Sequence, residues 1–512
     1  MKHYLVIILL LTLLPCKSLL AQYNKPLRIE MEVKAGEEPF RLVPCGENGM
    51  VLFAQTNKNE NKDNVLWAFN FYDENLKSLG QVLYPVPHTY DFLDYEIENN
   101  SLFMIFNSSR TSKGDECMLL FIDPVKYIIA SIPFKVPEKT NICSFKISGN
   151  TAFVTLISKN NKFYVVKVNM NDGSNSVIVE EKADNPTLLS ILLEPSRNML
   201  SLFVQKEEKR SNFTYSTYSY DLNGARMGQA NYTGFNKNNY LVTAELFRNK
   251  VGEFLVLGSY NDEPEHRYGD YFSNGTETSG FVSGLLNSEA AKISYRNFSE
   301  ITDYHGYFND RNSILNRQTT KGKTKKLNEV NYTAVASNIH VVDSSYYLVL
   351  ETYVPEYHRN YRQIYNFYSN VPSAYSDYPI LDGFRFISAM TVSFNEKGNI
   401  KWSSAMEIRD VFSKYIYPRM NLVIDGDNDV LSYSTKGKIL SKVVNGPDSK
   451  TGYDQMSILP ENARDEIMDD FNNGLSYWYG NYFIAFGYQQ IRNNFSSENK
   501  RTVFYVNKLA FR

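Results

Sequence analysis

The chain has 512 residues, of which 43% are hydrophobic and 21% charged, with a formal net charge of −2. This near-neutral balance excludes a general nucleic-acid binder, which carries a basic excess. Aromatic residues make up 14% of the chain, with 38 Tyr and 32 Phe, and these side chains favour pleated, half-buried strands. The composition therefore predicts a large all-β protein with an extensive core.

The first 21 residues have the pattern of a secretory signal peptide. An apolar run from Tyr4 to Leu14 is too short to span a bilayer, and Ala21 precedes a plausible cleavage point. We therefore expect an exported protein of the periplasm or cell surface of a Gram-negative bacterium, with no transmembrane span in the mature chain. Cys16 offers an alternative as a lipidated cysteine, but Pro15 before it makes a poor lipobox.

The mature chain keeps Cys45, Cys117 and Cys143. An odd, sparse set of cysteines is not a disulfide framework, although one bridge could form in an oxidising compartment. We interpret these residues as small buried hydrophobic side chains.

An internal repeat runs through the mature chain. A turn of Gly, Asn, Asp or Ser followed by a short apolar strand occurs eight times. The eight apolar strands begin at Met50, Leu102, Ala152, Met199, Phe254, Tyr346, Val430 and Tyr482. Later in each unit, an apolar strand ends in an Asp or Asn turn, as at Tyr72-Asp73, Tyr220-Asp221 and Phe394-Asn395, and Val506-Asn507 could end the series.

Each unit thus contains four antiparallel strands in roughly 45–55 residues, the size of one propeller blade. The sequence predicts a β-propeller of four-stranded blades, eight by the repeat count, or seven if one unit is an insertion. A β-sandwich also has short strands and frequent turns, but it does not predict a regular period of this length.

The segment from Leu27 to Val33 alternates apolar and polar residues, as a half-buried strand does. The last unit ends soon after Asn507 and has little room for a fourth strand. We hypothesise that the early segment completes the last blade and closes the ring, because closure removes an exposed strand edge.

Three stretches interrupt the period of a single domain over residues 22–512, and we place them as loops on one rim of the ring: 299–333, 353–383 and 446–474. In the third, Ile467, Met468 and Phe471 lie at helical spacing, and Gly474 could end a short helix there.

The sequence contains no Gly-x-Ser-x-Gly, His-Glu-x-x-His or Cys-x-x-Cys pattern. Gly322-Lys323-Thr324 lacks the preceding glycine of a phosphate loop, so a solvated basic loop is the better interpretation. The run 425–429 resembles the start of a calcium loop, but its glycine is misplaced and a hairpin turn is favoured. We therefore assign no catalytic residue, metal site or cofactor.

Two further polar features have simple structural interpretations. The five mature histidines do not share metal-ligand spacing, and His340, in an apolar strand, is expected to be structural. Asp94, Glu96 and Glu98 alternate along one strand, which we interpret as a solvated face.

The loop over residues 353–378 is the candidate binding surface. Its tyrosines are Tyr353, Tyr357, Tyr361, Tyr365, Tyr368, Tyr375 and Tyr378. Tyrosine offers a large contact area with a polar tip, so such a loop suits a sugar, a peptide or another protein. The alternative is that the rings fold onto the propeller and cover it.

Several segments in the last third of the chain resemble a family of uncharacterised exported β-propeller-like proteins of Bacteroidota-type bacteria. The segments that carry the resemblance are 351–357, 381–386, 398–402, 478–483 and 504–508. The resemblance implies a location in the envelope, and it brings no activity or catalytic residue.

The leading hypothesis is an exported propeller that acts as a non-enzymatic binding or scaffold protein with a protein or glycan partner. One alternative is a propeller hydrolase or lyase acting on polysaccharide or peptide, which would need acidic and His residues meeting at the channel mouth. A structural subunit of an envelope complex is the other.

Overall fold

The structure is a computed structural model and describes residues 27–34, 39–108, 116–209, 212–262, 277–287, 291–304, 332–365, 372–425, 428–445, 452–493 and 500–510. The predicted signal peptide, Cys16 and the stretch Gly322-Lys323-Thr324 lie outside these residues. Among the described residues, no helix has the length and hydropathy needed to cross a bilayer.

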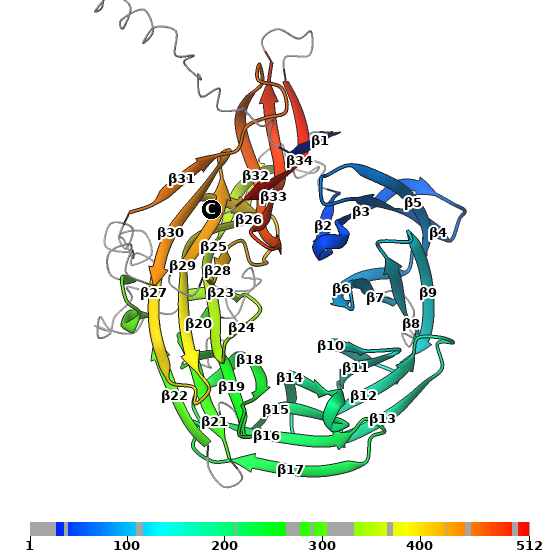
Figure 1. Cartoon of the computed structure of the whole chain (residues 1–512), viewed down its shortest axis with the longest axis vertical. Helices are drawn as coiled ribbons and strands as arrows, with labels where there is room; N and C mark the ends of the chain where they lie inside the picture. Colours follow the sequence, from blue (N-terminus) through cyan, green and yellow to red (C-terminus); the bar gives the residue numbers. More distant parts are fainter. Residues whose placement is uncertain are drawn as a thin grey trace, which may run out of the picture.

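Eight antiparallel sheets follow one another around a ring, which confirms the predicted β-propeller and its count of eight blades (Figure 1). Blade 1 comprises β2 (Arg41–Pro44), β3 (Met50–Asn59), β4 (Asn64–Tyr72) and β5 (Ser78–Pro87). Blade 2 comprises β6 (Tyr90–Glu98), β7 (Ser101–Ser108), β8 (Glu116–Asp123) and β9 (Ile128–Lys135). Blade 3 comprises β10 (Thr140–Ser148), β11 (Thr151–Ser158), β12 (Lys162–Asn169) and β13 (Asn175–Lys182).

The middle blades follow the same order. Blade 4 comprises β14 (Pro186–Glu194), β15 (Met199–Lys209), β16 (Asn212–Asp221) and β17 (Arg226–Tyr232). Blade 5 comprises β18 (Tyr240–Arg248), β19 (Phe254–Asn261), β21 (Gly280–Leu286) and β22 (Ala291–Asn297). Blade 6 comprises β20 (Glu277–Thr278), β23 (Tyr332–Ala336), β24 (His340–Val342), β25 (Ser345–Tyr365), β26 (Pro372–Asn395) and β27 (Ile400–Ser413).

The last two blades complete the ring. Blade 7 comprises β28 (Asn421–Val423), β29 (Asp429–Thr435), β30 (Lys438–Asn445) and β31 (Asp454–Ser457). Blade 8 comprises β32 (Glu466–Tyr479), β33 (Tyr482–Arg492), β34 (Lys500–Ala510) and β1 (Arg28–Val33). Single 3-10 turns lie at η1 (Gly46–Asn48), η2 (Pro195–Arg197) and η4 (Phe298–Glu300).

The core of the protein lies between the blades rather than at the centre of the ring. Eight hydrophobic clusters each join two neighbouring blades, and every neighbouring pair has one. The apolar strands predicted from the repeat are the second strands of the blades, β3, β7, β11, β15, β19, β25, β29 and β33. They are apolar along most of their length because neighbouring strands and neighbouring blades cover them.

Side-chain acceptors fix the Asx turns at the outer hairpins. The Asp221 carboxylate accepts the backbone N–H groups of Asn223 and Ala225 at 2.9 and 2.7 Å. Gly224 follows with φ of +91°, and a Cβ there would lie 2.1 Å from the carbonyl oxygen of Ile178. This turn therefore requires glycine. Asn507, in contrast, does not end a strand as expected, because it lies inside β34.

The N-terminal segment closes the ring as hypothesised. β1 pairs with β34 in antiparallel register from Arg28↔Asn507 to Val33↔Thr502. The sheet order is β1-β34-β33-β32, so the early strand supplies the fourth strand of the last blade.

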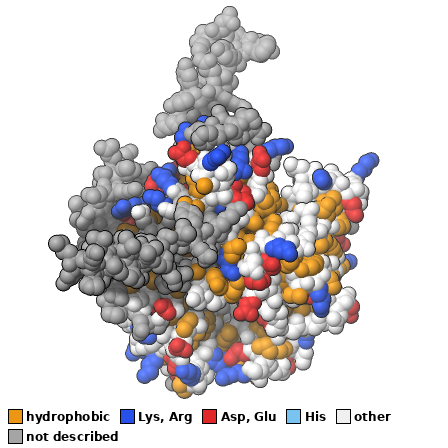
Figure 2. All heavy atoms as spheres, turned by 45° about the horizontal axis from the view of Figure 1, so that its top comes forward, with side chains coloured by type: hydrophobic (Ala, Val, Ile, Leu, Met, Phe, Trp, Pro, Cys, Tyr) orange, Lys and Arg blue, Asp and Glu red, His pale blue; other side chains and the backbone are white. Residues whose placement is uncertain are grey.

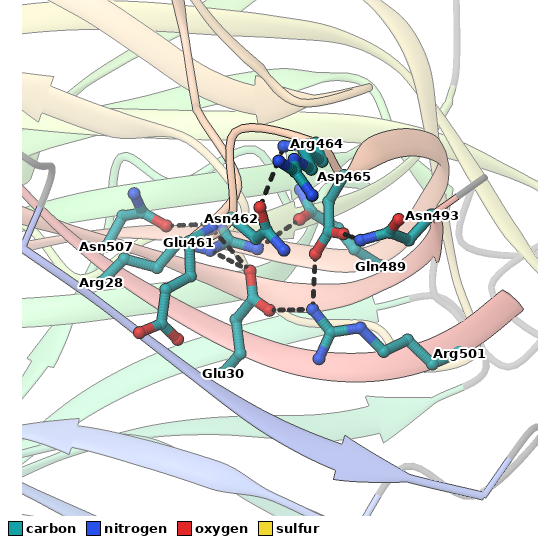
Figure 3. Close-up of polar contacts among 10 residues, drawn as sticks. All are labelled: Arg28, Glu30, Glu461, Asn462, Arg464, Asp465, Gln489, Asn493, Arg501 and Asn507. Atoms are coloured by element: carbon teal, nitrogen blue, oxygen red, sulfur yellow. Dashed lines mark hydrogen bonds and ion pairs between the residues drawn. The ribbon is translucent and has the colours of Figure 1, made fainter. Parts of the chain in front are cut away.

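A buried polar cluster fastens this closing strand (Figure 3). The Arg28 guanidinium, whose side chain is fully buried, donates to Asn507 Oδ1 at 2.7 Å, to Gln489 Oε1 at 2.8 Å and to the Glu30 carboxylate at 2.7 Å. Arg501 bridges Glu30 at 2.8 Å and Asp465 at 2.6 Å. The charges of Arg28 and Glu30 thus find partners on β33, on β34 and in the segment before β32, which offsets the cost of burying them.

The short helix expected near residues 467–474 is wrong, since this stretch belongs to strand β32. The register with β33 shifts between Ile467 and Asp469 and again between Phe471 and Gly474. These bulges break the two-residue alternation of a strand, and the remaining apolar spacing imitates a helix.

Deleting residues 23–35 removes β1 and leaves the edge of β34 unpaired. We expect a sharp fall in melting temperature, measured by circular dichroism or differential scanning calorimetry. An unchanged melting temperature would show that β1 does not close the ring.

Substituting Arg28→Met keeps the strand but removes the donors to Asn507, Gln489 and Glu30. Because buried acceptors are left without partners, we expect unfolding free energy to fall by about 3 kcal/mol in urea titration. The exposed Lys77→Met variant is the control and should unfold like the parent. Equal stability of the two variants would contradict a fastening role for the cluster.

Candidate functional site

The first strands of the blades face the centre of the ring, where β6, β10, β14 and β18 lie in succession (Figure 1). Each of these four strands contains one β-bulge against its second strand. The bulged residues are Leu93, Cys143, Leu189 and Val242. Because bulges re-aim side chains, they set which residues point toward the centre of the ring.

Charged residues occupy equivalent positions after these bulges. The third residue beyond the bulge is Glu96 in β6, Lys146 in β10 and Glu245 in β18. The Lys146 ammonium forms an ion pair with the Glu96 carboxylate. Both groups also act electrostatically on Glu245, so the fold brings together three charges that are far apart in the sequence.

Asp94 belongs to the same group of charges. Its carboxylate accepts the Tyr95 N–H at 2.8 Å, and its pKa is raised chiefly by burial, against the lowering effects of that N–H and of Lys146. The alternating carboxylates of β6 are thus not only a solvated face, because Asp94 and Glu96 interact with the neighbouring blade.

A pocket of about 300 Å³ opens between blades 4, 5 and 6. It is lined by Thr187, Leu188, Leu189, Val242, Thr243, Ala244, Glu245, Leu257, Gly258, Ala336, Ser337, Asn338, Ile339 and Leu348. The bulged residues Leu189 and Val242 form part of its wall. Blade 6 forms another part of the wall, because its first strand is interrupted. β23 and β24 both pair with β25, and residues 337–339, which lie between them, line the pocket.

Glu245 is the one charged side chain among the described residues that line this pocket. The backbone N–H of Ile339, at the break in the blade 6 strand, lowers the pKa of this carboxyl group. Burial nevertheless raises the pKa of Glu245, and this effect exceeds the lowering by Lys146 and by the Ile339 N–H. Within the described part of the chain, no Lys or Arg forms an ion pair with Glu245.

His340 follows the pocket-lining Ile339 in the sequence. It is exposed on β24, and partial desolvation by the groups around it lowers its pKa. A structural role inside an apolar strand was expected, whereas the structure places His340 on a short strand whose three residues are exposed.

The predicted tyrosine loop takes a different form in the structure. Residues 353–365 and 372–378 are strand, because β25 and β26 extend together as a long hairpin. Tyr353 is buried, with its ring 5.4 Å from Phe384 and 5.7 Å from Phe386, and Tyr357 is half-buried. The backbones of Tyr361, Tyr365, Tyr375 and Tyr378 lie in the hairpin, whereas their side chains and the whole of Tyr368 lie outside the described residues.

Other residues singled out in the sequence do not join the pocket. Cys45 and Cys117 are buried as expected, and Cys143 is exposed at its bulge. Asp429, from the calcium-like run, begins β29 and accepts a hydrogen bond from Asn445 at 3.1 Å. Over the described ranges, no group of three His, Cys, Asp or Glu side chains could hold a metal ion.

Sequence reasoning missed Glu245. Glu245 lies in β18, a strand with an ordinary alternating pattern. It lines a pocket because the strand of blade 6 is interrupted at residues 337–339. A weak signal was present in Ser337-Asn338, a polar pair that interrupts an otherwise apolar run.

The described face of the molecule carries Lys and Arg interspersed with Asp and Glu, without one large patch of a single sign (Figure 2).

No protein-family model matches the chain, and no curated protein matches it either. Among solved structures, it is similar to the polysaccharide lyase Uly1, with 10% identity, a TM-score of 0.35, and coverage of 82% of this chain and 89% of that chain. It is also similar to Sqt1 of Saccharomyces cerevisiae, with 8% identity, a TM-score of 0.42, and coverage of 94% and 98%. The periplasmic gluconolactonase of Pseudomonas aeruginosa matches at 9% identity, a TM-score of 0.38, and coverage of 82% and 100%.

Proposed function

We propose that this chain is an exported, non-enzymatic binding protein that holds a ligand in the pocket beside Glu245. The observation that carries the proposal is a lone carboxylate set in an otherwise uncharged pocket, whose lining is divided about equally between polar and apolar surface. Pockets of this kind bind small molecules through a few polar groups that fix orientation and apolar walls that supply contact area.

The chemistry of the pocket favours an organic cation with an apolar body. A carboxylate that is partly removed from water gains most from a cationic partner, because the interaction is stronger in a poorly hydrated site. Leu188, Leu189 and Val242 contribute apolar surface to the lining, and the hydroxyl-bearing Thr243 and Ser337 contribute polar groups.

The raised pKa of Glu245 fits this assignment. Since burial outweighs the effects of Lys146 and the Ile339 N–H, the negative charge of Glu245 is only partly compensated. Lys146 is itself engaged by Glu96, which leaves a bound cation as the natural counter-charge for Glu245.

Catalysis is less well supported by the same site. A glycan-cleaving enzyme of the common type uses two carboxylates that flank the scissile bond. Among the described residues that line it, this pocket contains one carboxylate, because Asp94 and Glu96, although they belong to the same group of charges, do not line it. A hydrolase or lyase that acts on polysaccharide or peptide therefore remains the alternative, and turnover lost in Asp94→Asn would favour it.

The proposal predicts a charge-selective pocket. We expect n-hexylamine to bind, and n-hexanol and hexanoate to bind at least roughly tenfold more weakly, as measured by isothermal titration calorimetry at pH 8. Glu245→Gln should weaken n-hexylamine binding by a similar factor, whereas Glu47→Gln, in an exposed turn of blade 1, should not.

The same titration has a predicted pH dependence. n-Hexylamine, like a Lys side chain, is protonated at pH 8, so its affinity should hold there and fall as the pH is lowered and Glu245 is protonated, which begins at a higher pH than for an ordinary Glu. Equal binding of the three probes, or binding unchanged in Glu245→Gln, would count against the proposal.

A further inference from the structure

A second pocket, of about 380 Å³, lies between blades 2 and 3 and shares no residue with the first. One wall is the face of blade 2, and the other is formed by two turns of blade 3, at Gly149-Asn150 and Met170-Asn171. These blades are neighbours in the ring (Figure 1).

The floor of this inter-blade pocket is an apolar row that crosses three strands. Phe103, Phe121 and Ala130 are direct cross-strand partners on β7, β8 and β9. The two phenyl rings lie 5.4 Å apart with an interplanar angle of 48°. The row ends in a small, exposed residue at Ala130, so the floor stays open toward the outer edge of the blade.

The opposite wall leaves space above this floor. Gly149 has φ of +55°, and a Cβ there would find nothing within 4 Å. Next to it, the Asn150 side chain donates to Asn169 Oδ1 at 3.2 Å, and the Asn171 N–H donates to the same oxygen at 3.0 Å. Asn169 thus fixes both turns of blade 3 that border the pocket.

The polar lining is mostly neutral. Side-chain amides and hydroxyls of Asn99, Asn150, Asn171, Ser101 and Ser131 are joined by one carboxylate, that of Glu98. Amides and carboxylates can each bond the hydroxyls of a polyol, because they offer donors and acceptors in fixed geometry. Aromatic floors in turn suit the C–H faces of sugar rings, which present apolar surface.

We propose that the inter-blade pocket between blades 2 and 3 binds a neutral sugar ring. The ring stacks its C–H face on the half-buried Phe121, which is backed by the buried Phe103, and its hydroxyls bond the amides of the blade 3 turns and the Glu98 carboxylate. This site is independent of the pocket beside Glu245 and takes a ligand of different chemistry.

Saturation-transfer difference NMR of the full chain with D-glucose, D-galactose, D-mannose and N-acetyl-D-glucosamine tests the assignment. We expect at least one of these sugars to bind. Ala130→Phe fills the floor from an exposed position and should weaken that binding at least roughly tenfold. Ser176→Phe, on the exposed outer strand of blade 3, lines neither pocket and should leave it unchanged.

Two further variants keep the outcomes distinct. Glu98→Gln, a surface change that is compatible with folding, should also weaken sugar binding, and it decides the question if Ala130→Phe does not fold. Glu245→Gln should leave sugar binding intact. The sugar-binding proposal and the cation-binding proposal can therefore fail independently of each other. The inference is overturned if none of the four sugars binds, if binding survives both Ala130→Phe and Glu98→Gln, or if n-hexylamine competes for this pocket.

Discussion

Pairing of β1 with β34 is the constraint on which the ring depends. Every hydrophobic cluster lies between two blades, so the eighth blade must be complete for its clusters with blades 7 and 1 to form. Arg28 and Glu30 bring charge into this joint and are matched there by Asn507, Gln489 and Arg501. Backbone pairing closes the ring, and the polar cluster sets its register, because a shift of one residue would turn both charges to the wrong face.

The two candidate pockets arise from departures from ideal blades. In the first, bulges at Leu189 and Val242 and the break at residues 337–339 widen the space around Glu245. In the second, Ala130 and Gly149 leave a gap where larger side chains would close the interface between two blades. The regular strands supply stability, and the irregular or small residues supply room for ligands.

Much of this architecture was predictable from the sequence, because period-2 alternation and Asx turns such as that at Asp221 are local signals. The eight apolar strands and the closing role of residues 27–33 followed from them. The expected helix near Met468 was wrong because bulges in β32 distort the spacing of apolar residues. The expected loop at residues 353–378 was wrong in its secondary structure, because composition does not show that β25 and β26 pair as a hairpin. Glu245 could not be found, because its pocket depends on Ile339, a residue of a different blade.

The hydrogen bond from the Arg28 guanidinium to Asn507 Oδ1 joins residues that are 479 positions apart in the sequence. A chain made from its N-terminus onward must therefore hold β1 unpaired until β34 has been synthesised. Contacts between residues so far apart in the sequence make folding slow. Until they form, the unpaired edge of β34 is exposed and prone to aggregation. A helper protein that shields residues 27–33 during this interval would raise the yield of folded molecules without altering their final stability.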